Sequence, residues 1–302
     1  MSTYANRWIV GLDLRPSGQG AIRFARFLGT DTTHGSCTLV GIHVLPDAQI
    51  RAAQRYHDLD ELKAGAVEQA EMMVNKAGAA DVLTEMQVVR GRRAEQSLEA
   101  ARVYHHAEGL IVGRQAPRQG HHLFRLGKVA RRLLRTLGGP VVVVPPDWEP
   151  ESVDPEGPIV CATNLGDGAA AAARFAAELA TWLGRPLVFV HIVPVAEDYG
   201  ANYIPLASRE KMAAESQVEG ERELAAWVEE LGIAGATEIV RQGHVTEQLL
   251  GVAHETKAAV LVSGSRRLSS FERLLLTSVG SELAATARCP VAVVPPPAAE
   301  TR

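Results

Sequence analysis

Short aliphatic runs alternate with longer segments of helical period along almost the whole chain. Between the runs at 37–45 and 84–89, apolar side chains recur every three or four residues, which predicts an amphipathic helix. The side chains of this stripe are Leu59, Leu62, Ala66, Ala70, Met73 and Ala77. Strands that alternate with helices predict a parallel sheet with helices on both of its faces.

Five aliphatic runs occur in each half of the chain, and each run is expected to be a strand. Those of the first half are Trp8–Asp13, Cys37–Leu45, Thr84–Val89, Leu110–Val112 and Val141–Val144. Those of the second half are Ile159–Thr163, Leu187–Val193, Thr237–Val240, Val260–Ser263 and Val291–Val294. The pattern therefore predicts two tandem, doubly wound α/β domains, each with a five-stranded parallel sheet flanked by four helices.

The two halves are also copies of one another, with a period near 150 residues. Matching segments recur in order at 23–25 and 174–176, at 41–46 and 189–194, and at 139–146 and 289–296. Between the copies, 145–158 holds five prolines and five acidic residues, which is typical of a stiff, solvated linker. We expect a first domain at 1–147, an acidic, proline-rich linker at 148–157 and a second domain at 158–302.

Composition and charge exclude several classes of protein. Hydrophobic residues make up 46% and charged residues 22%, as in ordinary globular domains, and a net charge of −4 is too balanced for a generic nucleic-acid binder. No apolar run approaches the roughly 18 residues of a membrane span, and the short polar start resembles no signal peptide. Three distant cysteines, Cys37, Cys161 and Cys289, indicate a reducing compartment rather than disulfides or a cysteine metal site. We expect a cytoplasmic protein.

Ligands of a doubly wound sheet bind beyond the carboxyl ends of the strands, where the winding reverses. The loops after the first and fourth strands are therefore the places to search in each half. In the first half, Asp13 ends the first strand, and Gly113 and the pair Gly127-Lys128 follow the fourth. In the second half, Gly264 and Ser278 follow the fourth strand.

These residues resemble the motif of the universal stress protein family. Nucleotide-binding members carry Gly, two residues, Gly, nine residues and then Gly with Ser or Thr between the fourth strand and helix, and an Asp at the end of the first strand. The resemblance extends over both copies through His43-Val44, His191-Ile192 and Cys289-Pro290. It implies a tandem universal stress protein with the adenine-nucleotide alpha-hydrolase-like fold. ATP or another adenine nucleotide is the implied ligand, and Val44 belongs to the implied site.

The first copy departs from that motif at several positions. Gly113 stands at the first glycine, Ala116 at the second, ten residues follow instead of nine, and Gly127-Lys128 replaces Gly-Ser. Glycines let backbone N–H groups approach phosphates, and a lysine meets a phosphate as a point charge. The candidate nucleotide-binding residues of the first copy are therefore Asp13, Val44, Gly113, Ala116, Gly127 and Lys128.

The second copy keeps the spacing together with Gly264 and Ser278, but Arg267 and Thr277 replace the two later glycines. Asn164 replaces the Asp of the first strand. Side chains in place of glycines narrow the phosphate cradle. We therefore expect nucleotide to prefer the first copy, and a filled or vestigial pocket is the alternative for either copy.

The stretch from Arg114 to Gly139 contains seven cationic residues and no acidic one. A solvated helix face with cations near its C-terminus is the simpler interpretation. The alternative is a surface for an anion or an acidic partner, in which Lys128, Arg114 and Arg118 contact the anionic group.

Other motifs predict structure rather than chemistry. Gly18 begins like a dinucleotide fingerprint, but Arg23 occupies the third glycine position, so Gly18 is expected at a helix entry. The pairs His105-His106 and His121-His122 are expected to be solvated, because adjacent side chains point in different directions and cannot easily share a metal. His43 and His191 are expected to be hydrogen-bonded core residues. No nucleophile is visibly paired with a base, so neither a catalytic nor a metal site is expected.

The expected function is that of a cytoplasmic stress-response regulator with an ATP site in its first domain, acting by interaction rather than turnover. A regulatory scaffold without nucleotide and a nucleotide-hydrolysing enzyme with weak ATPase activity are the alternatives. The valine-rich strands at 141–144 and 291–294 predict pairing between the copies as an intrachain pseudo-dimer, and a homodimer of chains is a further candidate. We expect no membrane and no sequence-specific nucleic acid as partner, and the sequence identifies no protein partner.

Overall fold

A computed structural model of the chain describes residues 6–30, 37–83, 85–115, 126–194, 206–265 and 278–297. It divides into two compact units. The first unit contains Met1–Ser152 and Ala284–Ala292, and the second contains Val153–Leu283 and Val293–Arg302. Each unit is an α/β fold built on a parallel sheet, as the alternation of aliphatic runs and helical segments predicts.

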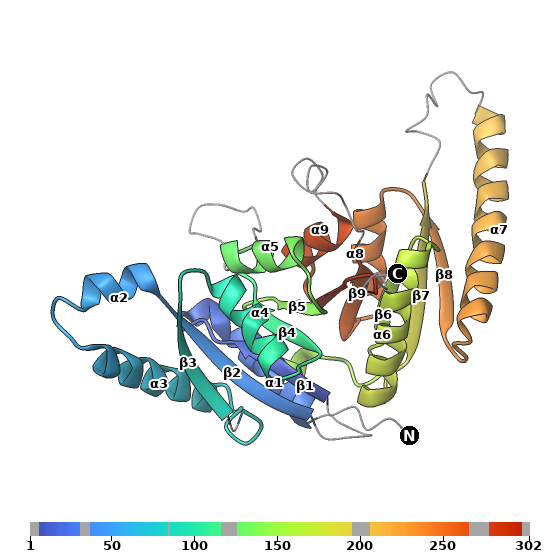
Figure 1. Ribbon diagram of the computed structural model, residues 1–302. Helices are drawn as coiled ribbons and strands as arrows, with labels where there is room; N and C mark the ends of the chain where they lie inside the picture. The colour runs from blue at the N-terminus through green and yellow to red at the C-terminus, as the bar shows by residue number, and fades with distance from the viewer. Residues whose placement is uncertain are drawn as a thin grey trace, which may run out of the picture. The chain divides into compact units, whose positions relative to one another are not determined.

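The sheet of the first unit has the strand order β3-β2-β1-β4-β5, and its strands pair in parallel. The strands are β1 (Asn6–Gly11), β2 (Cys37–Pro46), β3 (Glu85–Gly91), β4 (Gly109–Gly113) and β5 (Val141–Val144). The helices are α1 (Gln19–Thr30), α2 (Asp47–Ala53), α3 (Leu59–Lys76), α4 (Ala94–Tyr104) and α5 (Lys128–Arg135). Figure 1 shows how these helices cover the sheet.

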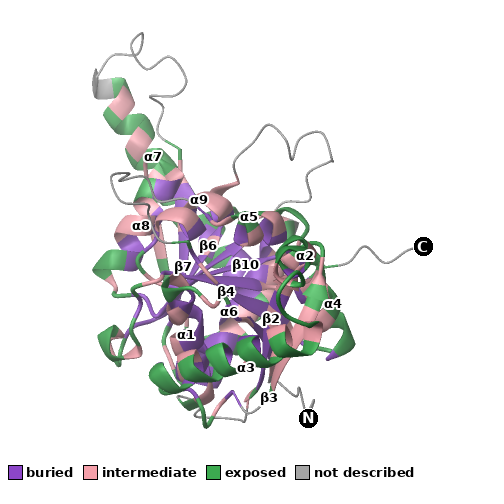
Figure 2. Ribbon diagram, turned by 90° about the vertical axis from the view of Figure 1, so that its left-hand side faces the viewer, coloured by how far each residue is buried: buried purple, intermediate pink, exposed green. Residues whose placement is uncertain are grey.

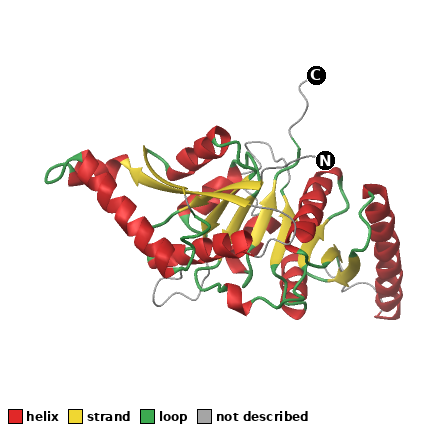
Figure 3. Cartoon of the chain, turned by 90° about the horizontal axis from the view of Figure 1, so that it is seen from below, coloured by secondary structure: helices red, strands yellow, loops and turns green. Residues whose placement is uncertain are grey.

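The sheet of the second unit has the equivalent order β10-β9-β6-β7-β8. Its strands are β6 (Ile159–Thr163), β7 (Leu187–Val193), β8 (Thr237–Gln242), β9 (Val260–Gly264) and β10 (Val291–Val294). Its helices are α6 (Asp167–Leu183), α7 (Leu206–Leu231), α8 (Val245–Glu255) and α9 (Val279–Thr286). The last residues of α9 and the first two of β10 fall within Ala284–Ala292, the part of this half of the chain that belongs to the first unit. Strands with helices on either side, drawn in yellow and red in Figure 3, confirm the predicted fold class.

Most element boundaries agree with the predicted ones or differ from them by one or two residues, and two differences bear on the site and the helix count. The bounds of β5, β6, β7 and β10 agree with the prediction. The strand β1 ends at Gly11, so Asp13 lies just beyond the strand instead of at its last position. The helix α2 is not predicted by periodicity, because its seven residues bury a single side chain, Ile50, which is too few to define a period.

Small aliphatic side chains fill much of the core, as an aromatic content of 5% requires. In α3 the buried face consists of Ala66, Ala70 and Val74, and a capping box of Asp58 and Glu61 starts the helix. The buried strands form the purple centre of Figure 2. None of the helices in the described ranges has the length and apolar character that crossing a membrane requires.

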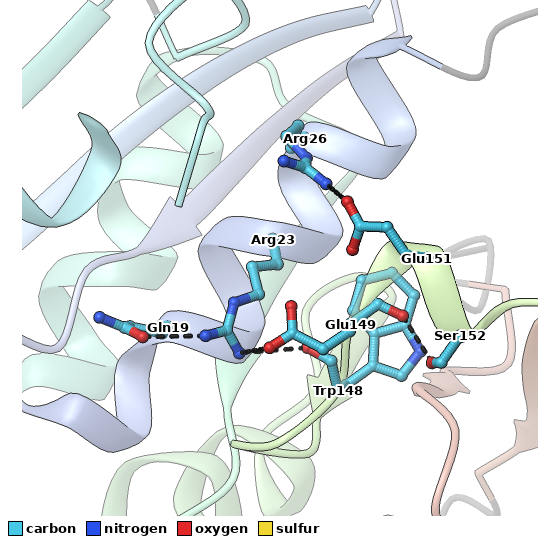
Figure 4. Close-up of polar contacts among 7 residues, drawn as sticks. All are labelled: Gln19, Arg23, Arg26, Trp148, Glu149, Glu151 and Ser152. Carbon is cyan, nitrogen blue, oxygen red and sulfur yellow. Dashed lines mark hydrogen bonds and ion pairs between the residues drawn. The ribbon is translucent and has the colours of Figure 1, made fainter. Parts of the chain in front are cut away.

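The start of the acidic segment at 148–157 packs on α1, although we expect a solvated linker. Trp148 is 5% exposed, and its ring lies edge-on to the rings of Phe24 and Phe27, with centroids 5.4 and 5.7 Å away. Two ion pairs border this contact, Arg23–Glu149 at 3.0 Å and Arg26–Glu151 (Figure 4). The expected solvation is therefore wrong for Trp148, because an aromatic side chain in a polar segment gains more from burial than from hydration.

The end of the segment is attached to the second unit. Asp154 accepts hydrogen bonds from Arg185 through its backbone carbonyl, at 2.6 Å, and from Lys257 through its carboxylate, at 2.8 Å. The hydrogen bond from Lys257 lowers the pKa of the Asp154 carboxyl below its ordinary value. Both ends of the segment are thus held by cations of the unit to which each end belongs.

Trp148→Ala is expected to lower the free energy of unfolding by about 3–5 kcal/mol, because it removes a buried aromatic ring from the α1 contact. Urea unfolding followed by circular dichroism measures the change. Tyr56→Ala, at a side chain that is 83% exposed, is the control and should stay within about 0.5 kcal/mol of the parent. Equal, small effects of the two variants would show that the segment is not anchored by Trp148.

Candidate functional site

A cleft of about 710 Å³ opens at the carboxyl ends of β1, β2 and β4 in the first unit. In the sheet, β1 lies between β2 and β4, so the chain winds outward in opposite directions from β1. The loops that leave neighbouring strands diverge at such a reversal and leave a crevice between them. The residues Gly127 to Ala130, at the start of α5, form a further wall of the cleft.

Five of the predicted site residues line this cleft. Asp13 follows β1, Val44 lies in β2, Gly113 ends β4, and Gly127 and Lys128 begin α5. Asp13 and Lys128 are exposed, whereas Val44 is buried. Ala116 lies outside the described residues. The structure thus brings together residues from four separate segments.

Two glycines hold the loop after β1 in place. Gly18 ends the 3-10 turn η1 (Pro16–Gly18) that leads into α1, which agrees with its predicted place at a helix entry. A Cβ atom on Gly18 would lie 2.2 Å from the carbonyl oxygen of Asp13, so only glycine allows this approach. A Cβ atom on Gly113 would lie 3.1 Å from the carbonyl oxygen of Ser17. Sequence reasoning missed this role of Gly18, because the spacing indicates a turn but not the atom that the turn touches.

The first turn of α5 favours negative charge in the cleft. The N-cap residue Gly127 has no side chain to accept a hydrogen bond, and the first turn contains no acidic residue. The free N–H groups and the helix dipole therefore give this end a partial positive charge. Lys128, at the first helical position, adds a full positive charge to the same wall.

The equivalent helix of the second unit, α9, begins differently. The Ser278 hydroxyl oxygen accepts a hydrogen bond from the backbone N–H of Ser281 at 3.2 Å and lies 2.9 Å from the Ser281 hydroxyl, so it caps the helix. Glu282 places an acid in the first turn. Gly264 keeps the place of Gly113 at the end of its strand, beside α6. Arg267 and Thr277 lie outside the described residues.

The last helix of each unit is hydrogen-bonded to the helix before it at an equivalent position, but the side chain that the last helix contributes has opposite charge in the two units. In the first unit, Arg132 on α5 donates a hydrogen bond to Glu95 on α4 at 2.9 Å, and Glu95 is buried. In the second unit, Thr246 on α8 donates to Glu282 on α9 at 2.9 Å. The helix that borders the candidate site thus contributes a cation in the first unit and an anion in the second.

The expectation that Arg114 contacts an anionic group needs correction. It lines the cleft but is 4% exposed, and its Nη1 atom donates to the carbonyls of Ala285 and Ala287 at 3.0 and 2.7 Å, within the same unit. Burial lowers the pKa of the Arg114 guanidinium, against the opposing charges of Asp147 and Cys289. Backbone carbonyls satisfy this buried donor, so Arg114 has a structural use. Arg118 lies outside the described residues.

His105, His106 and the buried thiol of Cys161 do not line the cleft. His105 is 9% exposed, with its ring edge-on to Tyr104, so the expected solvation is wrong for His105, and His106 is exposed. His121 and His122 lie outside the described residues. Within the part of the chain that the structure describes, no three metal-ligating side chains gather. Burial raises the pKa of the Cys161 thiol to about 12, which keeps this thiol protonated and unreactive.

Comparison with known proteins finds a family match for the second half of the chain and a fold for the whole of it. The model of the universal stress protein family matches residues 157–295, and no curated protein matches the chain significantly. A universal stress protein from Archaeoglobus fulgidus DSM 4304 is 17% identical, with a TM-score of 0.63 over 97% of this chain and 99% of that chain. A functionally unknown protein from Pseudomonas aeruginosa PAO1 is 14% identical, with a TM-score of 0.65 over 97% and 93%. Both structures share the fold of the two halves.

Gly18→Ala is expected to lower the free energy of unfolding by about 1–3 kcal/mol, because the added methyl group displaces the loop that carries Asp13. Gly65→Ala, in the middle of α3 where a Cβ atom meets nothing within 4 Å, is the matched control. This control should raise the free energy of unfolding by about 0.5–1 kcal/mol, since alanine loses less backbone entropy in a helix. If both variants are stabilised equally in urea unfolding, the backbone at Gly18 has room for a Cβ atom, and the close contact with Asp13 is contradicted.

Proposed function

We propose that the chain is a tandem member of the universal stress protein family, whose model matches residues 157–295, and that its first unit binds an adenine nucleotide, with ATP as the reference ligand. The observation that carries this proposal is the convergence of Asp13, Val44, Gly113, Gly127 and Lys128 on one cleft. The proposed role is that of a cytoplasmic stress-response regulator. In this role nucleotide occupancy alters interactions with a protein partner.

Each group of the cleft fits one part of a nucleotide. The Asp13 carboxylate is exposed in the cleft and accepts hydrogen bonds, so it suits the hydroxyl groups of a ribose or the amino group of a base. Gly113 and Gly127 present backbone without side chains, which allows close approach. The positive end of α5 and Lys128 suit phosphate oxygens.

We propose that the second unit binds nucleotide weakly or not at all. Its Ser278 hydroxyl is engaged as a helix cap, and Glu282 places negative charge in the same turn, where a phosphate would be repelled. Asn164 stands in place of the carboxylate and accepts hydrogen bonds less strongly. The proposed asymmetry is that the first unit holds the ligand and the second has another use.

Two alternatives lead to different observations on freshly purified protein. A regulatory scaffold without nucleotide would release no adenine nucleotide on denaturation, whereas the proposed function predicts ATP or a related nucleotide by mass spectrometry. An enzyme would release ADP or AMP from ATP steadily in the presence of excess ATP. The proposed regulator binds ATP without such turnover.

Asp13→Ala is expected to weaken ATP binding by tenfold or more, since hydrogen bonds to a charged group contribute about 1.5–3 kcal/mol. Asn164→Ala, the equivalent change in the second unit, is the matched control and should leave the dissociation constant within about twofold. Isothermal titration calorimetry measures both. Equal losses, or a loss in Asn164→Ala alone, would contradict the assignment to the first unit.

Lys128→Glu is expected to weaken ATP binding more than Arg135→Glu, which makes the same reversal of charge about two turns further along α5. An exposed lysine–phosphate contact weakens with added salt, so the affinity of the parent should fall between roughly 0.05 and 0.5 M salt. The salt dependence should be smaller in Lys128→Glu. Equal small effects of both changes, or binding that is insensitive to salt, would show that the cations of α5 form only a solvated face.

A further inference from the structure

Just beyond the end of β1, a side chain makes the hydrogen bond that a neighbouring strand would otherwise make. The parallel pairing of β1 with β2 ends at the pair Gly11 and Ile42, and the backbone N–H of Leu12 still donates to the carbonyl of Ile42 at 2.9 Å. The next group along the chain, the Leu12 carbonyl, lies 2.8 Å from Nδ1 of His43. The imidazole thus supplies the donor that a further backbone N–H would supply in a longer ladder.

The same contact recurs in the second unit. His191, in β7, places its Nδ1 atom 3.1 Å from the carbonyl of Thr163, the last residue of β6. In each unit the bonded carbonyl belongs to the residue directly before the position of Asp13 or Asn164. Two copies with substantially different sequences have therefore kept the same bond at the same place.

The bond also determines the state of the ring. A carbonyl oxygen only accepts hydrogen bonds, so Nδ1 of each histidine must carry the proton. In the neutral ring, Nε2 is then an acceptor. His43 is half-buried and lines the cleft.

We propose that His43 is a positioning residue of the nucleotide cleft, an inference that rests on the proposed function of that cleft. Asp13 is held only loosely through its own side chain, because its ion pair with Arg15 is 3.7 Å long and exposed on both sides. Its backbone, by contrast, is fixed on one side by Gly18 and on the other by the bond from His43 to Leu12. The imidazole thus orients the carboxylate through the backbone without touching the ligand.

The test separates the hydrogen bond from the ring. His43→Phe keeps an aromatic ring but removes the donor, whereas His43→Asn keeps an N–H donor close to the position of Nδ1. His43→Phe should raise the ATP dissociation constant about fivefold to tenfold, as loss of one hydrogen bond predicts, and His43→Asn should restore it to within about threefold of the parent. His191→Phe, which loses the equivalent bond in the second unit, should leave ATP affinity within about twofold while losing comparable thermal stability.

Two measurements do not depend on nucleotide. Long-range nitrogen–proton NMR at about pH 8, where a typical histidine is neutral, should show the Nδ1–H tautomer for both His43 and His191. In His43→Phe, the amide of Asp13, which shares a peptide unit with the Leu12 carbonyl, should shift, and the amide of Leu12, which donates to Ile42, should lose protection from hydrogen exchange. His43→Asn should recover both. If the parent binds no ATP, the proposed function fails. The NMR signals then still show whether His43 bonds to the Leu12 carbonyl and fixes the backbone at Asp13.

Four results would overturn the inference. An Nε2–H tautomer for His43 would exclude the bond to Leu12. Failure of His43→Asn to restore affinity in a folded protein would show that the ring contacts the ligand directly. Equal losses of ATP affinity in His43→Phe and His191→Phe would show a general effect on folding, and an unchanged Asp13 amide would show that the bond does not position that residue.

Discussion

The structure of the candidate site depends on one constraint, the reversal of winding at β1. A parallel sheet needs a crossover for every strand pair, and β1 has β2 on one side and β4 on the other. The loops after β1 and β4 therefore separate, and the backbone groups at the strand ends lose the partners that a longer ladder would provide. Gly18, Gly113 and His43 compensate at this point, two by close packing and one by a hydrogen bond. The cleft is what remains between them.

The two units show how one frame is adapted through its side chains. The strand ends, the first glycine of the motif and the histidine bond are present in both, since they maintain the fold. The charges on the last helix are reversed, with Arg132 in the first unit and Glu282 in the second, each in a bridge to the preceding helix. A change of charge at such a position costs little stability when its partner changes too, but it alters the potential that a phosphate meets. The asymmetry of the proposed function follows from this difference.

The sequence predicts the fold well because the fold is encoded in local periods. Aliphatic runs, the stripe of α3 and the two matched halves each appear in the sequence without tertiary information. The features that the sequence does not reveal arise from long-range contacts. Trp148 is part of an acidic segment, but its ring packs against Phe24 and Phe27. Arg114 is one of seven cations in its stretch, but it is buried and donates to backbone carbonyls of a segment that is distant in sequence. Five site residues converge as the motif suggests, whereas their ligand and the pairing of the two copies stay predictions.

We propose that a chain with two copies of the same fold keeps a single nucleotide site. Native mass spectrometry of the full chain, titrated with ATP well above its dissociation constant, counts bound ligands directly. We expect one ATP for each chain at saturation. Two bound nucleotides for each chain would show that the second cleft still functions, and none would show that the first cleft does not bind ATP.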